Sequence, residues 1–528
     1  MEIIKKLYNA LKTKYFLLAA SGVVCAVLQS SAELAPAAFV SYAPMMYLLC
    51  SFEGRRELVK RFGCFFVPYY FYQLVFLLTV YRQIEMKRPL AVLLLLLAVI
   101  VLTVWESILM LMPVLLFAYL RRGGAFDVVV LSLLIASGEW LEENIFVLSF
   151  PWSAVWLSVT GMPVALQTAN LLGCRIVTAL LLSFNGFAAF AVMHPKRMRA
   201  AAGAAAVLGI MLGYGFYSVS AAEMAGRDSP QIKVLIAQDE KEGSKKSGCS
   251  ALDCARSYSE LITSQNESAD LIVLPETAVP TSYDESAAEF DIISRLAKNS
   301  GAAVVNGCFF RLDGDGYNAL YAAQPQGKAS RPYLKQVLVP FGERVPLASL
   351  FGVGTLCECS DEEYTKPLET GVGKVGCAIC IESIYPTTVH KQAFCGAQLL
   401  CVCTNDSWFS NSYARKMHFR HSIMRAVENG KYLLRSGNCG ISAVISPSGK
   451  IESIREETTK GVVTGSAALI SQKTFYSRTN DLFSVIPALL TAAAVMKAYT
   501  RREKFGSPNF LTELSACQVS CELPRPCS

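Results

Sequence analysis

Repeated long apolar runs constrain the fold of this chain more than any other feature. They fill roughly the first 220 residues, and one more follows near the C-terminus. An apolar run near the length of the bilayer core is typical of a spanning helix. Candidate spans lie at 15–30, 33–50, 63–80, 90–118, 125–148, 162–193, 200–220 and 481–499. The pattern predicts a polytopic α-helical membrane region of about eight spans.

Lysine and arginine residues indicate how these spans are oriented. The segment before the first span is basic, as are the loops after the second, fourth, sixth and eighth spans. These basic residues are Lys5, Lys6, Lys12, Lys14, Arg55, Arg56, Lys60, Arg61, Arg121, Arg122, Lys196, Arg197, Arg199, Lys497, Arg501, Arg502 and Lys504. Because basic loops face the cytoplasm, both termini are predicted inside and the segment between the last two spans outside. Only the loop with Arg82, Lys87 and Arg88 disagrees.

Four glutamates lie in or beside the apolar runs. A carboxylate inside the bilayer is costly, which makes Glu106 and Glu139 candidates for a functional role. Glu142 and Glu143 are expected nearer the outer interface, in contact with water. The stretch FPWSAVW (Phe150–Trp156) is typical of an aromatic belt at that interface.

The residues between the last two spans have a different composition. The whole chain is 53% hydrophobic and 17% charged, too apolar for a soluble enzyme and too charged to lie wholly in a membrane. From 228 to 472, short β-branched runs such as QIKVLIAQ and DLIVLPE alternate with helix-like stretches, which indicates an α/β domain. We therefore predict a membrane region at 1–227, this domain at 228–472, a last span at 473–504 and a polar cysteine-containing cytoplasmic tail at 505–528.

Net charge does not point to a nucleic-acid partner. The chain carries a formal net charge of +7, but its basic residues cluster beside the apolar runs. Such clusters are better explained as signals of membrane topology than as a phosphate-binding surface. We expect no nucleic acid among the partners.

Three predicted strands end on groups able to do chemistry. LIVLPE ends in Glu276, PYLKQVLVPFGE carries Lys335 and Glu343, and VGCAICIE carries Cys380 followed by Glu382. A carboxylate that takes the thiol proton and an ammonium that stabilises an oxyanion would together allow acyl transfer. Each residue alone also has an ordinary explanation, as a helix-cap neighbour, a surface lysine or a small buried hydrophobe.

The cysteines leave other interpretations open. Three pairs are spaced closely enough to resemble metal ligands: Cys357 and Cys359, Cys377 and Cys380, and Cys401 and Cys403. They lack the regular pairing of structural zinc sites, so no metal is predicted. A disulfide is compatible with an outward-facing domain, but the sequence does not give its connectivity.

Strand alternation assigns different positions to these sulfurs. Cys401 and Cys403 are two residues apart, so they should share one face of a strand, with Val402 on the other. Cys377 and Cys380 are three apart and are expected on opposite faces. We therefore expect Cys377 to pack as a small hydrophobe and Cys380 to end its strand as a reactive thiol.

The order and spacing of LPE, K…VPFGE and CIE resemble the nitrilase, or carbon–nitrogen hydrolase, superfamily. This resemblance implies an αββα sandwich with a Glu-Lys-Cys triad. A domain of this kind placed before a last membrane span is similar to the bacterial apolipoprotein N-acyltransferase family. The stretches FPWSAVWLSV and NDSWFSNS agree with that family, and the resemblance covers roughly residues 15–500.

The resemblance implies a role for each matching residue. Glu276 becomes the general base, Lys335 the oxyanion stabiliser, Cys380 the acylated nucleophile, Glu343 the supporting carboxylate and Glu382 a residue that shapes the site. Three further residues are expected to bind or support substrate: Phe341, Asn405 and Trp408. The chain departs from the family's usual pattern at three positions, where aromatic residues or glycine are common: Ile381, Arg344 and Ser410.

The implied reaction is ping-pong acyl transfer without a cofactor. The thiolate takes an acyl chain from a phospholipid, expected to be phosphatidylethanolamine, and the α-amine of a diacylglyceryl-cysteine on an apolipoprotein then takes it from the thioester. The resemblance implies a monomer in the bacterial inner membrane with its catalytic domain on the periplasmic face. A mobile apolar lid, at Leu350–Leu356 and Trp408–Tyr413, should shield the thioester from water.

Two other functions use the same sequence features differently. A membrane-tethered nitrilase-type amidase would use the same triad with water as the second nucleophile. A non-enzymatic membrane scaffold would need none of the three residues. The large membrane region disfavours the first alternative, and the presence of all three triad residue types disfavours the second.

Overall fold

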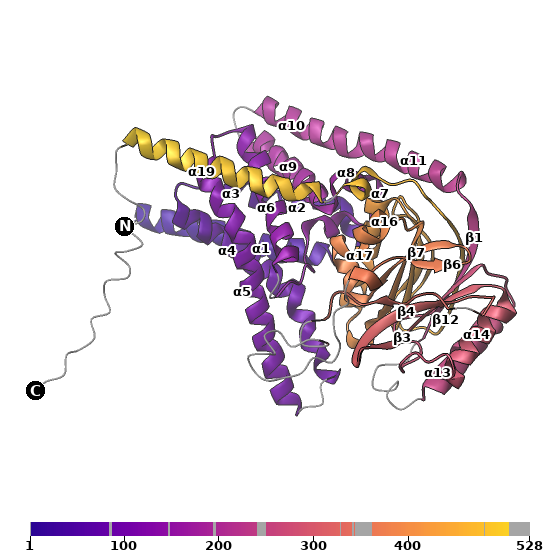
Figure 1. The fold of residues 1–528 in the computed structure, drawn as a ribbon. Helices are drawn as coiled ribbons and strands as arrows, with labels where there is room; N and C mark the ends of the chain where they lie inside the picture. Colours follow the sequence, from indigo (N-terminus) through magenta and orange to yellow (C-terminus); the bar gives the residue numbers. More distant parts are fainter. Residues whose placement is uncertain are drawn as a thin grey trace, which may run out of the picture.

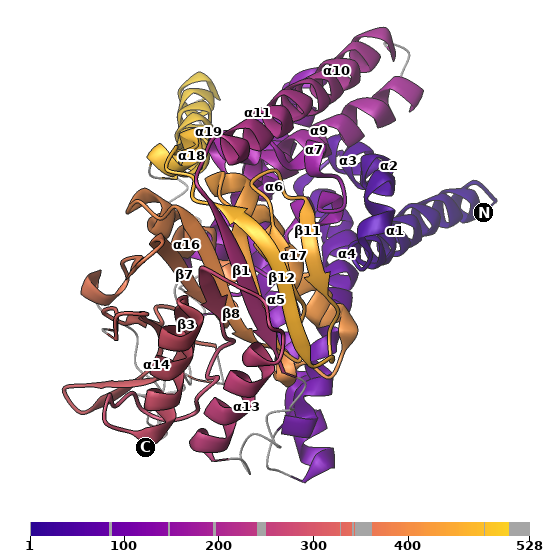
Figure 2. The same cartoon turned by 90° about the vertical axis from the view of Figure 1, so that its right-hand side faces the viewer.

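The computed structural model describes residues 2–83, 87–145, 148–193, 197–239, 250–327, 329–339, 343, 362–479 and 481–505. Two parts lie side by side in it (Figure 1). A helical region contains the N-terminal half and the last helix, and a domain of two β-sheets contains the residues between them. Viewed from the side of the two-sheet domain, much of the helical region lies behind the sheets (Figure 2).

Apolar helices make up the first part. In chain order they are α1 (Glu2–Leu28), η1 (Ala32–Ala37), α2 (Ala38–Ser41), α3 (Ala43–Cys50), α4 (Arg55–Leu74), η2 (Val75–Gln83), α5 (Arg88–Leu120), α6 (Ala125–Asn144), η3 (Val155–Val159), α7 (Pro163–Leu166), α8 (Ala169–Leu172), α9 (Cys174–Met193), α10 (Arg197–Gly209), η4 (Ile210–Tyr214), α11 (Gly215–Arg227) and, after the sheets, α18 (Phe475–Arg478), η8 (Leu482–Ser484) and α19 (Val485–Phe505). Within the described residues, five segments are long and apolar enough to cross a membrane: Ala32–Cys50, Arg55–Arg82, Arg88–Leu120, Cys174–Met193 and Met198–Arg227.

Each predicted span contains helix, with two differences in detail. The predicted span 162–193 begins with the short helices α7 and α8, and only α9 is long. Helix α6 packs against α5 and α9 but carries Asp127, Glu139, Glu142 and Glu143, and it is not among the five long apolar segments. Several apolar helices therefore form the N-terminal half, as the apolar runs predict.

Basic residues from three separate segments of the chain gather at one end of the helical region. Arg121, after α5, donates to the carbonyl of Phe52 at 2.7 Å, and Arg55 lies over the ring of Tyr119 at 4.3 Å. Lys497 of α19 donates to the carbonyl of Leu120 at 3.2 Å. The loops after the predicted second, fourth and eighth spans thus share one side, as the charge pattern predicts.

The second part has two six-stranded sheets. The first has the order β12-β1-β2-β3-β4-β5, and the second the order β11-β10-β9-β8-β7-β6. The strands are β1 (Gln231–Gln238), β2 (Leu271–Val273), β3 (Ala303–Leu312), β4 (Asp315–Ala323), β5 (Tyr333–Leu334), β6 (Leu368–Thr370), β7 (Gly373–Ile379), β8 (Leu399–Asn405), β9 (Leu433–Asn438), β10 (Ser442–Ile445), β11 (Ile451–Arg455) and β12 (Gly461–Ala468). In each sheet the central strands are parallel and the outer ones antiparallel.

Helices cover the outer face of each sheet, which makes a four-layered α/β domain. Helices α13 (Ala251–Thr263) and α14 (Ala288–Ser300) pack on the first sheet, and α16 (Pro386–Phe394) and α17 (Ser412–Asn429) pack on the second. A dry core of valine, leucine and cysteine side chains lies between the sheets. Cys401 and Cys403 point into that core with their sulfurs 3.6 Å apart, while Val402 points toward α17, which confirms the predicted alternation.

The aromatic stretch Phe150–Trp156 does not form the interfacial belt predicted above. Trp152 is fully buried, and its ring lies 5.6 Å from Phe409 and 5.9 Å from His418 of the two-sheet domain. These rings instead fill the seam between the two parts. The prediction was wrong because amphipathic aromatic rings suit a protein–protein seam as well as a lipid headgroup region.

The prediction that Glu142 and Glu143 contact water is also wrong. Both are buried. Glu143 pairs with Arg175 of α9 and accepts a 2.9 Å hydrogen bond from the Thr387 hydroxyl at the start of α16. Burial of a charge requires a partner of opposite charge, which Arg175 supplies, and the Thr387 hydrogen bond joins the helical region to the segment that follows Cys380.

Candidate active site

Glu276, Lys335 and Cys380 each follow a strand closely, and the fold brings them together. Glu276 comes after β2 and Lys335 directly after β5 of the first sheet, and Cys380 follows β7 of the second sheet. The backbone N–H of Asn405, at the end of β8, donates to the Glu276 carboxylate at 2.8 Å and so links the two sheets there. Functional groups at the carboxyl ends of parallel strands are the arrangement expected for a site in an α/β fold.

A fully buried lysine lies at the centre of this cluster. Lys335 Nζ is 3.1 Å from Glu276 Oε1 and 2.8 Å from Glu343 Oε1. Burial by itself would lower the pKa of Lys335, but the two carboxylates outweigh it and hold the pKa well above its usual range. Lys335 therefore remains an ammonium at any ordinary pH.

Asn318 of β4 orients the two carboxylates around Lys335. Its side-chain amide donates to Glu276 at 2.7 Å and to Glu343 at 3.4 Å. Its backbone carbonyl also accepts the N–H of Lys335 at 2.9 Å. Asn318 was not singled out from the sequence, because an asparagine within a strand of this domain carries no motif of its own.

Cys380 occupies a backbone conformation that is uncommon for a residue with a side chain. Strand β7 ends at Ile379, and Cys380 has a φ of 53°, in the left-handed region, as it opens the short helix η6 (Cys380–Ile384). Such a conformation costs free energy and persists only where the surroundings hold it. The Ser383 hydroxyl donates to the Cys380 carbonyl at 2.9 Å, which helps to hold this turn.

The electrostatic surroundings of Cys380 keep its thiol protonated. Burial raises the pKa of the thiol, the Glu276 carboxylate raises it further, and the Lys335 ammonium acts in the opposite direction. The net shift is upward, so little thiolate exists at neutral pH. Nucleophilic attack by this sulfur therefore needs a base beside it. Glu276 is the candidate base, since its carboxylate charge raises the pKa of the thiol.

Glu382 lies two residues beyond Cys380 and accepts hydrogen bonds from segments of both sheets. Its carboxylate accepts from the backbone N–H of Ile379 at 2.6 Å and of Gln336 at 2.5 Å, and from the Tyr333 hydroxyl at 2.8 Å. Burial raises the pKa of Glu382 to about 7, while these donors act in the opposite direction. Glu382 thus fixes the strand of Lys335 against the turn of Cys380.

A buried network of Asp406, His418 and Arg435 also supports the turn at Cys380. His418 Nε2 lies 3.0 Å from the Cys380 carbonyl, and its Nδ1 lies 2.7 Å from Asp406. Arg435 donates to the second Asp406 oxygen at 3.0 Å. Burial by itself would raise the pKa of Asp406, but His418 and Arg435 hold it well below its usual range.

Sequence reasoning missed this network, because the burial that indicates it is visible only in the structure. Arg435 lies in β9, whose six residues are all buried, and a charge inside such a strand requires a partner. The partner, Asp406, directly follows Asn405 in the stretch TNDSWF. Asp406 and Arg435 are far apart in the sequence, and they meet only because the strands β8 and β9 pair in parallel.

The remaining predicted residues lie around this centre. Asn405 accepts a hydrogen bond from the Asn438 side-chain amide at 2.8 Å. Trp408, three residues beyond the end of β8, is 47% exposed. Phe341 and the predicted lid Leu350–Leu356 lie outside the described residues. In the second predicted lid segment, Phe409 packs 5.6 Å from Phe76 of the helical region, whereas Trp408 and Ser412 are exposed.

One predicted orientation is wrong. Cys377 and Cys380 both contact the core between the sheets instead of pointing to opposite faces. The left-handed turn at Cys380 interrupts the strand alternation on which the prediction depends. Both cysteines are buried, but Cys380 is 9% exposed as a residue and Cys377 only 1%.

We expect thiol reagents to modify Cys380 much faster than Cys377. Burial raises the pKa of both thiols, but only Cys380 opens toward solvent. Replacing Glu276 with glutamine removes a negative charge that raises the Cys380 pKa, so the midpoint of the pH–rate profile for alkylation should move to lower pH. The measurement is peptide-resolved mass spectrometry after brief iodoacetamide treatment. Equal rates at the two cysteines would contradict this assignment.

The fold and the site define a carbon–nitrogen hydrolase-type domain joined to an apolar helical region. A family model described as carbon-nitrogen hydrolase matches residues 250–471, and one described as the apolipoprotein N-acyltransferase N-terminal domain matches residues 21–187. An apolipoprotein N-acyltransferase of Allorhizobium ampelinum is 30% identical over 384 residues, which cover 68% of this chain and 70% of the relative. This chain belongs to the apolipoprotein N-acyltransferase family.

Other comparisons extend over different lengths. An apolipoprotein N-acyltransferase of Geobacter metallireducens is 28% identical over 524 residues, covering 94% of this chain and 97% of the relative. Among solved structures, the chain is similar to a nitrilase-superfamily protein of Saccharomyces cerevisiae. That match has 17% identity and a TM-score of 0.37, and it covers 50% of this chain and 94% of the other.

Proposed function

We propose that this chain transfers an acyl chain from a membrane phospholipid to the α-amine of the N-terminal diacylglyceryl-cysteine of an apolipoprotein. Its family membership supports an N-acyltransferase. The observation that carries the mechanism is the buried Lys335 ammonium, held between Glu276 and Glu343, beside a thiol on a left-handed turn. All the groups that the chemistry needs are protein side chains, so the reaction requires no cofactor.

The first half-reaction forms a thioester. Glu276 takes the proton of the Cys380 thiol, and the thiolate attacks the carbonyl carbon of the phospholipid ester. The negative charge that develops on the carbonyl oxygen is stabilised by the Lys335 ammonium. When the ester C–O bond breaks, Glu276 returns the proton to the leaving oxygen, and a lysophospholipid departs.

The second half-reaction transfers the acyl chain to nitrogen. The acceptor's α-amine attacks the thioester carbonyl and gives a proton to Glu276. Lys335 again stabilises the oxyanion, and the C–S bond breaks to form the amide. Glu276 then returns the proton to the sulfur, which restores the thiol. Because Glu343 also pairs with Lys335, at 2.8 Å, we assign it to keeping the lysine in place through both steps.

The helical region supports the placement that this reaction requires. We propose eight spans in the bacterial inner membrane, with the basic end in the cytoplasm and the two-sheet domain, residues 228–472, on the periplasmic face. Both substrates are anchored in the outer leaflet, so a site fixed there meets them at high effective concentration. We further propose that the donor is phosphatidylethanolamine, that the enzyme acts as a monomer, and that Trp408 belongs to a lid over the thioester.

Trapping the acyl-enzyme tests this function. The purified chain is given phosphatidylethanolamine vesicles without acceptor, and one equivalent of lysophospholipid should appear together with one hydroxylamine-sensitive acyl group on Cys380. Adding a diacylated lipopeptide should clear that group and acylate the peptide. An amidase-like hydrolase would instead release fatty acid continuously without acceptor. Absence of any thioester on the parent enzyme would refute the proposed mechanism.

Replacing His418 with alanine is expected to slow acylation of Cys380 by about 100-fold, because small displacements of a reacting atom carry a cost of that order. His418 contacts the Cys380 carbonyl and not the thiol, so it positions the turn. His390→Ala is the matched control, since His390 is also buried and hydrogen-bonded to backbone carbonyls, at Tyr476 and Thr479. The measurement is the single-turnover rate of lysophospholipid release on folded protein. Equal losses in the two variants would show that His418 serves only stability.

A further inference from the structure

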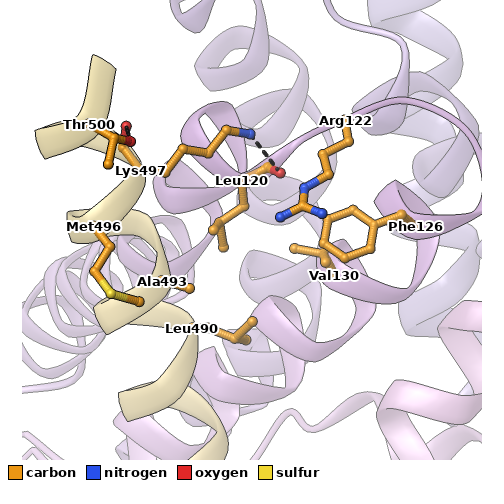
Figure 3. A pocket seen from close by; sticks show the side chains of 9 residues that line it. All are labelled: Leu120, Arg122, Phe126, Val130, Leu490, Ala493, Met496, Lys497 and Thr500. Carbon is orange, nitrogen blue, oxygen red and sulfur yellow. Dashed lines mark hydrogen bonds between the residues drawn. The ribbon is translucent and has the colours of Figure 1, made fainter. Parts of the chain in front are cut away.

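A groove lies at the basic end of the helical region and shares no lining residue with the site described above (Figure 3). It has a volume of about 360 Å³ and lies between α19 on one side and α5 and α6 on the other. Its lining residues are Leu120, Arg122, Phe126, Val130, Leu490, Ala493, Met496, Lys497 and Thr500. The volume is within the range of sites that hold small ligands.

The charges in this groove have one sign. Arg122 and Lys497 are cationic, and none of the nine lining residues is acidic. Lys497 Nζ donates to the carbonyls of Leu120 and Arg121 at 3.2 and 3.1 Å, which fixes its charge at the end of α5. The Arg122 guanidinium lies 4.9 Å from the Phe126 ring centre and reaches toward the groove (Figure 3).

A neighbouring hollow of about 570 Å³ extends the basic surface. It shares Arg122 with the groove and adds Arg55 and Arg121, with Glu53 as its single acidic residue. The rings beneath these cations, Phe52 under Arg121 and Tyr119 under Arg55, are each 4.3 Å away. The groove therefore opens into a surface that attracts anions.

The apolar lining begins beside the cations, at Leu120 and Phe126, and continues along the helices. Val130 lies two turns into α6, and Leu490 lies two turns before Lys497 on α19. Figure 3 shows Leu490 and Val130 on the side of the groove away from the Lys497 ammonium. A cationic end joined to an apolar channel between spanning helices matches an amphiphile with an anionic headgroup.

We propose that this groove binds an acidic phospholipid of the leaflet opposite to the acyl-transfer site. Its phosphate lies between Arg122 and Lys497, and an acyl chain lies along Phe126, Val130 and Leu490. The lipid would bridge α19 to α5 and α6. The other end of α19 is already held, because Asp481 accepts from Trp140 at 2.9 Å and pairs with Arg175 at 3.4 Å. Lipid in the groove would thus complete the docking of the helix that follows the catalytic domain.

Lipid retention on the full chain tests this proposal. The protein is extracted from vesicles of equal parts phosphatidylcholine and phosphatidylglycerol, and its bound lipid is counted by native mass spectrometry. We expect the parent to retain one phosphatidylglycerol, and the Arg122→Gln/Lys497→Gln variant to bind it about tenfold more weakly or worse. Because Lys497 also holds α5, Ala493→Phe is a second variant, which fills the groove without changing its charge and should also lose the lipid.

Matched controls separate this site from general attraction to basic surfaces. Arg56→Gln/Lys60→Gln removes the same charge from the same end of the protein, at exposed residues that line neither hollow, and should retain the lipid. Glycerol phosphate added in water should not displace it. The proposal is overturned if the parent shows no preference for phosphatidylglycerol, if Ala493→Phe retains it fully, or if soluble glycerol phosphate alone occupies the site.

Discussion

A Cys380→Ala variant is expected to lose N-acylation by a factor on the order of 10⁴ or more, since removal of a covalent nucleophile leaves only binding and oxyanion stabilisation. The measurement is N-acylation of a diacylated lipopeptide with phosphatidylethanolamine as donor, on the purified variant beside the parent. The thioester should disappear together with the product. A variant that still acylates the peptide would show that another group carries the acyl chain.

Cys377→Ala is the matched control for this loss. It removes a buried sulfur from strand β7, which leads into Cys380, and from the same core, so it tests for damage to packing alone. Its activity per folded molecule should stay near that of the parent, although its stability should fall through the cavity that it leaves.

Cys380→Gly adds a test of the turn itself. Glycine adopts a φ of 53° without the steric cost that alanine incurs there. Cys380→Gly should therefore be more stable than Cys380→Ala by about 1 kcal/mol, while both are inactive. If alanine were the more stable of the two, the left-handed conformation of Cys380 would store no strain.

The sequence predicts the centre of the site because that information is local. Glu276, Lys335 and Cys380 each follow a short apolar run, and their motifs need no knowledge of how the sheets pack. The alternation of Cys401 and Cys403 is equally local, because side chains in a regular strand alternate between its two faces. Charge patterning likewise places Arg55, Arg121 and Lys497 on one side without any knowledge of the contacts between their loops.

What the sequence did not predict depends on contacts between distant segments. Trp152 has the composition of an interfacial residue, and only its packing on His418 shows that it lies in a seam between two parts of the protein. Glu143 requires Arg175, a residue on another helix, to be stable when buried. The face taken by Cys380 depends on a single left-handed residue, and strand periodicity carries no information about where it will be interrupted.

Lys335→Met is expected to lower the rate of acyl transfer by about 10³-fold or more, because it removes the stabilising charge from the oxyanion. It also leaves the buried Glu276 and the partly buried Glu343 without a cation, which should destabilise the fold by about 3–5 kcal/mol. The folded-state pKa of Lys335 is raised, so its contribution to stability is present below its unfolded pKa of about 10.4 and is lost only above that pH. The parent's stability should therefore show no loss from this group between pH 6 and about 10.

Lys431→Met separates loss of catalysis from loss of a buried lysine. Lys431 is also fully buried, but it donates to the carbonyls of Ile470 and Gln472, and among the described residues no carboxylate pairs with it. Burial, aided by Lys473, lowers the pKa of Lys431 to about 8, the opposite direction to the shift at Lys335. Lys431→Met should lose stability and keep its activity per folded molecule, whereas Lys335→Met should lose both.

Adding Glu343→Gln to Lys335→Met should recover part of the stability, measured by thermal unfolding, and none of the activity. If it restored acyl transfer, Lys335 would be a structural ion-pair partner and the oxyanion would be held elsewhere.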